Sequence, residues 1–151
     1  MISWQYIAGF FDGEGSISRV GNWYRIIISQ THYEVLAAIR LFAQVGHVAK
    51  LTKRQAHWKD AWIYYIAKQK DVALFLRGIA PYLIVKRQYV IPILSAVDKL
   101  VTQQNSRERI ARNRKRQAKI LRQRGYSYRK IGRVLGIDWG YARRIILGRR
   151  H

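Results

Sequence analysis

An apolar segment that ends in glycines and two carboxylates, Tyr6–Ser16, constrains this chain more than any other part of it. Gly9 and Gly13 lie four residues apart, on one face of a predicted helix, and the lack of side chains there lets a second helix approach closely. Asp12 and Glu14 fall at the C-terminal end of that helix, where the macrodipole disfavours negative charge. A bound cation would compensate for this placement. The alternative is a buried N-terminal helix with a glycine stop and two solvated acids.

The charge of the chain points to a polyanionic partner. Its 151 residues include 29 Lys and Arg against 8 Asp and Glu, for a net charge of +21. Nucleic acid is the first choice of partner for such a chain. The chain has no Cys, which excludes thiolate metal sites, and no apolar run long enough to span a membrane, so we expect no membrane partner. We expect an intracellular, cytoplasmic protein, or an organellar one if it is organelle-encoded.

The basic residues are unevenly distributed. Residues 1–106 contain 13 basic and 6 acidic residues, whereas residues 107–151 contain 16 basic and 2 acidic residues. The composition changes at Gln103-Gln104-Asn105-Ser106. We therefore predict a core domain over residues 1–103 and a basic helical extension over residues 104–151.

The hydrophobic pattern of the first part predicts an α+β fold. After the opening helix, Gly21-Asn22 separates two strands as a tight hairpin turn would. Pro92 lies inside the last apolar helical pattern and should kink that helix or delay its start. The expected order is αββαββα, with a curved four-stranded antiparallel sheet that is covered by helices on one face and open on the other. The expected elements are strands 16–20 and 23–31, helix 33–45, strands 47–53 and 58–67, helix 71–79 and helix 85–102.

The C-terminal part predicts a helix-turn-helix. A basic helix over 107–124 should end at Gly125, and Ser127 and Asp138 are good N-caps for helices 128–135 and 139–147. Two short helices around Gly136 that follow a third helix are typical of a DNA-binding module. The alternative is a helical hairpin that only packs on the main domain. The expected small core consists of Ile131, Val134, Leu135, Ile137, Ala142, Ile145 and Ile146.

With this order of elements, the chain resembles the LAGLIDADG homing endonucleases. Tyr6–Ser16 matches the family's signature almost position by position. Gln30-Thr31 before the next helix, and the run Pro81–Lys86 before the last core helix, also resemble the family. The resemblance covers residues 4–101 and contains one copy of the signature. It implies a homodimer whose two signature helices pack on the two-fold axis, so that two subunits cut both strands of a pseudopalindromic site.

The resemblance also implies roles for individual residues. Glu14, with the backbone carbonyl of Gly13, holds a divalent metal, Mg²⁺, for which Ca²⁺ or Mn²⁺ can substitute. Gln30 orients water at the metal, and Lys86 positions water or stabilises charge on the phosphate. The plain alternative for Lys86 is a solvated lysine at a helix start. Hydrogen bonding at the helix interface is the implied role of Asp12, and the implied dimer interface consists of Ala8, Gly9, Asp12 and Gly13.

Two features depart from the family pattern. The metal position holds Glu14 where Asp is more familiar. A second basic active-site residue has no clear equivalent, and His32 and Arg40 are stand-ins.

DNA contacts are expected from three places in the chain. The open sheet face should read bases through side chains at every second position, whereas Trp62 and Tyr64 fit a core role better. The tip of the second hairpin should contact phosphates, and the last helices should lengthen the footprint. The predicted DNA-binding residues are Ser16, Ser18, Trp23, Arg25, Ile27 and Ser29 on the sheet, Lys53 and Arg54 at the tip, and Arg129, Lys130, Trp139, Tyr141, Arg143 and Arg144 in the helix-turn-helix.

The predicted function is that of a site-specific homing endonuclease. It would make a metal-dependent double-strand break in a long pseudopalindromic DNA site and leave 3′ overhangs, as the resemblance implies. Two alternatives stay open: a non-cleaving DNA-binding regulator, and an RNA-binding cofactor of intron splicing on the same scaffold. All three predict binding that weakens strongly with salt.

Overall fold

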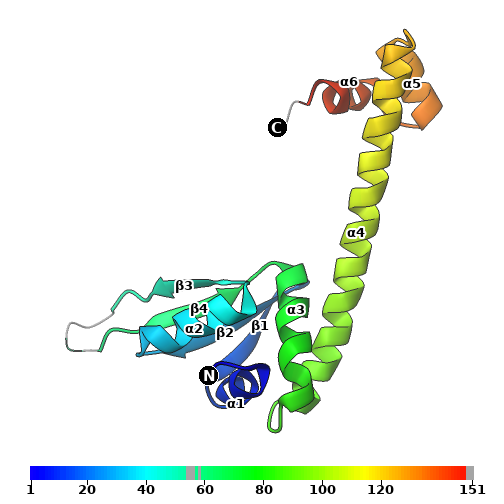
Figure 1. Ribbon diagram of the computed structural model, residues 1–151. Helices are drawn as coiled ribbons and strands as arrows, with labels where there is room; N and C mark the ends of the chain where they lie inside the picture. Colours follow the sequence, from blue (N-terminus) through cyan, green and yellow to red (C-terminus); the bar gives the residue numbers. More distant parts are fainter. Residues whose placement is uncertain (54–56, 58, 149–151) are drawn as a thin grey trace. The chain divides into compact units, whose positions relative to one another are not determined.

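The computed structural model describes residues 1–53, 57 and 59–148, and it confirms the expected α+β fold. Its described elements follow one another in the expected αββαββα order, with four further helical elements after them (Figure 1). They are α1 (Trp4–Glu14), β1 (Gly15–Val20), β2 (Trp23–Gln30), α2 (Tyr33–Ala43), β3 (His47–Lys50), β4 (Trp62–Ile66), α3 (Gln69–Ile79), the 3-10 turn η1 (Ala80–Tyr82), α4 (Arg87–Gln123), α5 (Tyr128–Leu135) and α6 (Trp139–Leu147).

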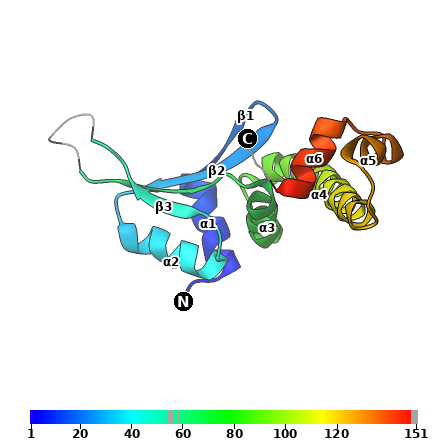
Figure 2. The same cartoon turned by 90° about the horizontal axis from the view of Figure 1, so that it is seen from above.

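The four strands form one antiparallel sheet in the order β1-β2-β4-β3. The hairpin of β1 and β2 turns at Gly21, whose φ of 60° a glycine adopts without strain. Helices α1, α2 and α3 lie on one face of the sheet, as the two views show (Figures 1 and 2). The other face of the sheet carries no helix of this part of the chain.

Alternation along the central strands explains why one face is covered. Ile26 and Ile28 of β2 and Tyr64 and Ile66 of β4 are buried under the helices. Each such side chain removed from water contributes on the order of 1.5–3 kcal/mol to folding. The Tyr64 hydroxyl donates a 2.8 Å hydrogen bond to the carbonyl of Val45, and burial raises the pKa of Tyr64 well above its usual range. Tyr64 therefore belongs to the core, as predicted.

Gln69 continues the sheet where β4 ends. Its side chain, only 3% exposed, accepts a hydrogen bond from the backbone N–H of Tyr24 and donates to the carbonyl of the same residue, at 3.1 and 2.8 Å. The amide thus replaces a missing strand partner for β2. α3 begins at Gln69, two residues before the predicted start.

The second hairpin has shorter strands than predicted. β3 ends at Lys50 rather than at residue 53, and β4 begins at Trp62 rather than at residue 58. The carboxylate of Asp60 pairs with Lys50 at 2.7 Å and with Lys53 at 2.9 Å, and hydrogen bonds from these ammonium groups hold the pKa of Asp60 below its usual range. This exposed charge cluster takes the place of strand pairing. Arg54 and Trp58 lie outside the described residues.

The prediction of two separate helices before residue 125 is wrong. α4 is one continuous helix from Arg87 to Gln123, and it contains both Pro92 and the segment 103–106. Gln103 to Ser106 change the composition but include no helix breaker, so the helix continues. By its contacts the chain nevertheless divides into two compact units, residues 1–101 and 102–151, two residues from the predicted boundary.

The C-terminal unit has its own small core, built on Ala118, Ile131 and Ala142. Val134 was expected there but is 57% exposed, because α5 turns the face that carries Ile131 and Leu135 toward the core instead. The predicted caps are confirmed: Ser127 accepts from the N–H of Lys130, and Asp138 accepts from the N–H groups of Gly140 and Tyr141. The expected helix-turn-helix arrangement is therefore present.

No helix among the described residues is both long enough and apolar enough to cross a membrane.

Candidate active site

α1 presents one buried side and one side of open glycines. The Ser3 side chain caps its first turn by accepting from the N–H of Tyr6, and Ile7, Ala8 and Phe11 are buried. Gly9 and Gly13 are exposed, and a Cβ added at either would meet no atom within 4 Å. The glycine face is therefore open in a single chain. Ala8, expected at the dimer interface, is 0% exposed and packs inside its own subunit.

The chain leaves α1 directly into β1. Gly15 follows Glu14, and a Cβ at Gly15 would overlap the ring of Phe11. The helix therefore ends at Glu14 and the strand begins at the next residue. The carboxylate of Glu14 is exposed, and no hydrogen bond or ion pair engages it within the described part of the chain. It is available for an external ligand.

The carboxylate of Asp12 has an internal role. It accepts hydrogen bonds from three successive backbone N–H groups, those of Ile84 at 2.8 Å, Val85 at 3.2 Å and Lys86 at 2.9 Å. Successive N–H groups of this kind form an anion-binding nest. Partial burial opposes the charge, but the backbone hydrogen bonds and the Lys86 ammonium outweigh it and hold the pKa of Asp12 below its ordinary value. In one chain, Asp12 thus ties α1 to the residues that precede α4.

Lys86 makes the reciprocal contact. Its ammonium donates to the carbonyls of Phe11 at 2.9 Å, Asp12 at 2.8 Å and Gly15 at 2.7 Å. An ammonium has three N–H donors, so this set uses all of them. The positive charge also lies at the C-terminal end of α1, where the macrodipole favours it. Lys86 is therefore neither a solvated lysine nor, in this state, one with a donor free for a phosphate. Its catalytic role stays a prediction.

Gln30 lies at the end of β2 near the junction of α1 and β1. Gly15 pairs with Ile28, so the register carries Gln30 just beyond the first residue of β1. Its side-chain oxygen accepts from the N–H of Thr31 at 2.7 Å and from the Thr31 hydroxyl at 3.2 Å. Its amide nitrogen makes no hydrogen bond to the residues that the structure describes, so it can bind water or substrate. Its predicted role is compatible with this position but is not tested by it.

The donors at this site suit a hard divalent cation. Glu14 offers a free carboxylate, and the carbonyl of Gly13 is not among the three that Lys86 engages. Oxygen ligands of this kind are those that Mg²⁺ and Ca²⁺ prefer. No group of three or more His, Cys, Asp or Glu side chains gathers within residues 1–53, 57 and 59–148. Mg²⁺ is commonly held by one or two protein carboxylates, with its other ligands from phosphate and water, so the Glu14 carboxylate and the Gly13 carbonyl are compatible with such a site.

The predicted base-reading residues share the open face of the sheet. Ser16 pairs with Ile27, and Ser18 pairs with Arg25. Directly opposite residues on antiparallel strands point to the same side. Arg25 and Ser29 are exposed, as is Trp23 at 47%. The alternation inferred from the sequence is confirmed, whereas DNA contact by these side chains stays a prediction.

Three further side chains on this face, those of His47, Ile63 and Tyr65, were not predicted from the sequence. Ile27 pairs with Tyr65, Tyr65 pairs with His47, and Ser29 pairs with Ile63. The rings of Tyr65 and His47 lie 5.6 Å apart, and both residues are exposed. Period-two counting along 62–66 could have found them, because burial of Tyr64 requires its neighbours to face the other way.

Most of the remaining predicted contacts that the structure describes are exposed, but they differ in their surroundings. Lys53 is paired with Asp60, so contact with a phosphate there requires exchange of this exposed ion pair. In the helix-turn-helix, the Lys130 ammonium lies 4.2 Å from the ring centroid of Tyr126, and the Arg144 guanidinium lies 5.8 Å from that of Tyr141. Arg129, Trp139 and Arg143 are exposed and Tyr141 is half-buried. His32 is the N-cap residue of α2 and Arg40 lies in its last turn, both exposed.

The fold and the site define an αββαββα protein whose first helix ends in a carboxylate beside an open glycine face. The family description that matches this sequence is "LAGLIDADG-like domain", over residues 3–80. The match covers more than half of the chain, so the chain belongs to the LAGLIDADG-like family. No curated protein sequence matches it.

Solved structures of similar fold include several homing endonucleases. The archaeal intron-encoded homing endonuclease I-Vdi141I, complexed with DNA, is 21% identical with a TM-score of 0.53, and the alignment covers 96% of this chain and 94% of that one. I-CvuI, in complex with its target in the presence of Ca, is 22% identical with a TM-score of 0.53, over 67% and 69% of the two chains. In a second I-CvuI complex, with uncleaved DNA and Mg, the chain spans 66% of the relative. At these identities the likeness shows the fold.

Proposed function

We propose that this protein is a site-specific DNA endonuclease that acts as a homodimer. The observation that carries the proposal is the exposed carboxylate of Glu14, held at the end of α1 immediately beside the open Gly9 and Gly13 face. If two copies of α1 pack through this face, the Glu14 residues of both subunits lie near one two-fold axis. Two carboxylates at one axis suit cutting both strands of a duplex.

The residues at the end of α1 and their neighbours would have different roles at the scissile phosphate. Glu14 and the Gly13 carbonyl would hold a divalent cation, Mg²⁺ in the working enzyme, which supplies Lewis-acid stabilisation of charge on the phosphodiester. Gln30 orients water with its free amide nitrogen. The Asp12 and Lys86 hydrogen bonds hold Glu14 at a defined place by joining the end of α1 to the start of α4.

The open face of the sheet and the basic helix-turn-helix support the choice of DNA as substrate. The sheet face offers Arg25, Ser29 and Trp23 to a groove without covering helices. I-CvuI and I-Vdi141I, which share the fold, were both solved with DNA. By analogy with the family, the target is a long pseudopalindrome and the products carry 3′ overhangs.

The test is cleavage of a randomised plasmid library by the purified full-length protein with Mg²⁺, followed by sequencing of the new ends. We expect one family of pseudopalindromic sites with short 3′ overhangs. Glu14→Gln should lower cleavage of the selected site by at least about 10²-fold, as loss of one electrostatic stabiliser does. Its affinity for the same site, measured with Ca²⁺, should be unchanged. A wild-type protein that binds plasmids of the library but produces no new ends with Mg²⁺ would overturn the endonuclease proposal.

A second candidate is a DNA-binding protein that does not cleave, and one observation favours it. All three donors of Lys86 are engaged by backbone carbonyls, which leaves this lysine no donor for a phosphate in the present state. This candidate predicts equal site affinity with and without divalent metal and no effect of Glu14→Gln on any activity. Tight binding to a folded intron RNA that persists in Glu14→Ala would instead indicate an RNA-splicing cofactor.

A further inference from the structure

A stretch of α4 in the C-terminal unit is exposed throughout in the described structure. Every residue from 105 to 117 is exposed, and Ala118 is the first residue of this stretch of helix to be buried. Helical segments of this length are only marginally stable in water without tertiary contacts. Burial therefore contributes little to the helical state of this segment, and contact with a partner would stabilise it.

The charge of this stretch is almost entirely of one sign. Between Arg109 and Ile137 the sequence contains eleven Lys and Arg and no Asp or Glu. A solvated helix face that serves only solubility mixes both signs, because like charges three or four residues apart repel one another. Glu108 is the one acidic residue from 105 to 137. The arrangement favours contact with a polyanion.

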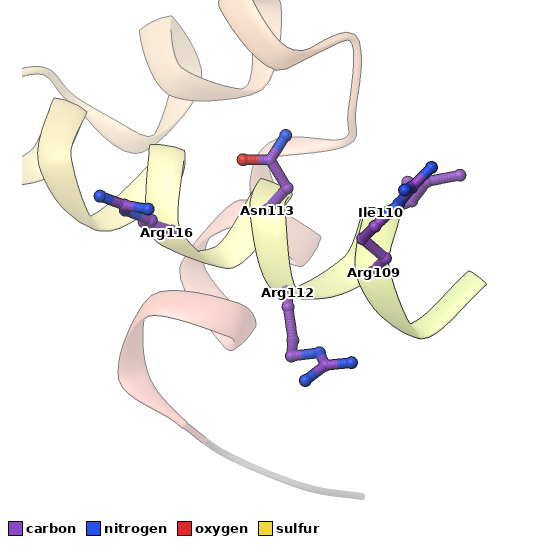
Figure 3. Close-up of a pocket in the computed structure, with 5 residues that line it drawn as sticks. All are labelled: Arg109, Ile110, Arg112, Asn113 and Arg116. Atoms are coloured by element: carbon purple, nitrogen blue, oxygen red, sulfur yellow. The ribbon is translucent and has the colours of Figure 1, made fainter. Parts of the chain in front are cut away.

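Four of these cations form a line along one side of the helix. Arg109, Arg112, Arg116 and Lys119 are spaced by three, four and three residues, and we call them the basic stripe. At about 100° per residue, Arg109, Arg112 and Arg116 lie roughly 120–180° around the helix from Ala118, which faces the small core, and Lys119 lies about 100° from it. Figure 3 shows Arg109, Arg112 and Arg116 projecting outward from the helix, where with Ile110 and Asn113 they line a shallow hollow open to solvent.

We propose that the basic stripe binds the phosphate backbone of duplex DNA. It is a third contact region, in addition to the sheet face and the helix-turn-helix. The stripe extends about 15 Å along the helix axis, and a duplex carries one negative charge for about every 1.7 Å of its own axis. Several phosphates thus lie within its length. Backbone contacts of this kind carry no base sequence, so the stripe contributes affinity and not specificity. This inference rests on the proposed function, because it takes the DNA to be duplex.

The experiment compares two full-length triple variants with the same change of net charge. The stripe variant is Arg109→Gln, Arg112→Gln, Arg116→Gln. The control variant is Arg107→Gln, Arg114→Gln, Lys115→Gln, which neutralises exposed cations on the other side of the same helix. Circular dichroism checks that both retain the helix content of the wild type. The probe is a duplex of arbitrary sequence and about four helical turns, roughly 40 base pairs.

The measured quantity is the slope of log affinity against log salt concentration. Each lost phosphate contact reduces the magnitude of this slope by about 0.9. The slope of the stripe variant should therefore be smaller in magnitude than that of the wild type by roughly two to three. Its affinity at 0.1 M salt should fall by about 10²-fold, whereas the control variant should lose less than about one in slope. Equal losses in the two variants would overturn the inference and leave the proposed endonuclease intact.

Failure of the proposed function looks different. In that case the wild-type protein cuts no site in the plasmid library, whatever the difference in salt dependence between the two variants. A stripe effect seen with folded RNA but absent with duplex DNA would also overturn the inference, since it assigns the stripe to another polyanion.

Discussion

Asp12 and Lys86 lie 74 residues apart and each binds the backbone around the other. The carboxylate binds three N–H groups before α4, and the ammonium binds three carbonyls at the end of α1. The two residues therefore engage backbone groups where α1 passes into β1 and where the chain approaches α4. Hydrogen bonds to charged groups are stronger than neutral ones, so this pair of residues holds the place from which Glu14 projects.

Asp12→Asn should destabilise the fold of the N-terminal unit. The amide offers one acceptor oxygen without charge to three N–H donors, so at least one charged hydrogen bond is lost. We expect the free energy of unfolding at pH 7 to fall by about 1–3 kcal/mol. Urea unfolding of the wild type and the variant measures it. Asp60→Asn is the matched control, and its effect should be much smaller because Asp60 is exposed.

The same pair of proteins should show a defined pH dependence. The pKa of Asp12 is lower in the folded chain than its ordinary value of 3.8, so the unfolded state binds the proton more tightly. The contribution of Asp12 is therefore fully present above that ordinary value and is lost as the pH falls through the folded pKa. The stability difference between wild type and Asp12→Asn should shrink below about pH 4. A difference that stays constant between neutral and acidic pH would contradict the ionic role.

α5 packs against the turn that leads to α6 at a position that admits no side chain. α5 and α6 approach each other at Gly132, where an added Cβ would lie 2.7 Å from the carbonyl oxygen of Ile137 and 3.2 Å from the N–H of Trp139. A hydrogen bond between the same two residues closes the turn: the N–H of Ile137 donates to the carbonyl of Gly132 at 2.9 Å. Backbone atoms on both sides leave little freedom to relax.

Gly132→Ala should therefore loosen the helix-turn-helix although alanine is the better helix former. Overpacking against backbone costs about 1–3 kcal/mol, which exceeds the gain of about 1 kcal/mol in helix propensity. Hydrogen exchange should become faster for amides in α5 and α6 and stay unchanged in β2 and β4. Arg129→Ala, at an exposed position of the same helix, should change exchange little. Slower exchange in Gly132→Ala than in the wild type would show that the turn does relax.

At the scale of the whole molecule, α1 is both a core helix and an exposed surface. Its buried side holds Ile7 and Phe11 in the subunit, and its open side holds Gly9 and Gly13. A residue can therefore be changed on the open side without disturbing the fold of one chain. This separation makes the proposed dimer testable.

Gly9→Leu should leave the single chain folded and weaken self-association. A side chain at Gly9 meets no atom within 4 Å, and leaving glycine inside a helix gains about 0.5–1 kcal/mol. In the proposed dimer, where two copies of α1 cross closely, the leucine side chain would hold the two helix backbones apart. We expect the dimer dissociation constant to rise at least about 10-fold, a loss of about 1.4 kcal/mol. Sedimentation equilibrium measures it, with Ser95→Leu on exposed α4 surface as the control. Equal association of both variants would place the dimer contact elsewhere.

The local parts of the structure could be predicted because they depend on neighbours in sequence. The glycine stops, the caps at Ser127 and Asp138 and the alternation of β2 each follow from a few adjacent residues. The continuity of α4 through residues 103–106 could not be predicted, because a polar segment without glycine or proline is compatible with either a linker or a helix. The prediction that Val134 lies in the small core was wrong for a related reason. A short amphipathic helix has more than one apolar face, and tertiary packing decides which face is buried.

The sequence by itself determined the family fold, the basic character and the place of Glu14 at the end of the first helix, because periodicity, charge and the signature are properties of the chain order. Only the tertiary structure decided what Asp12, Lys86 and Gln69 do, since their partners are backbone groups 45 to 75 residues away. No side-chain pattern records the position of a distant N–H or carbonyl. The structure also decided that the glycine face is open in a single chain, because openness depends on which elements fail to cover it.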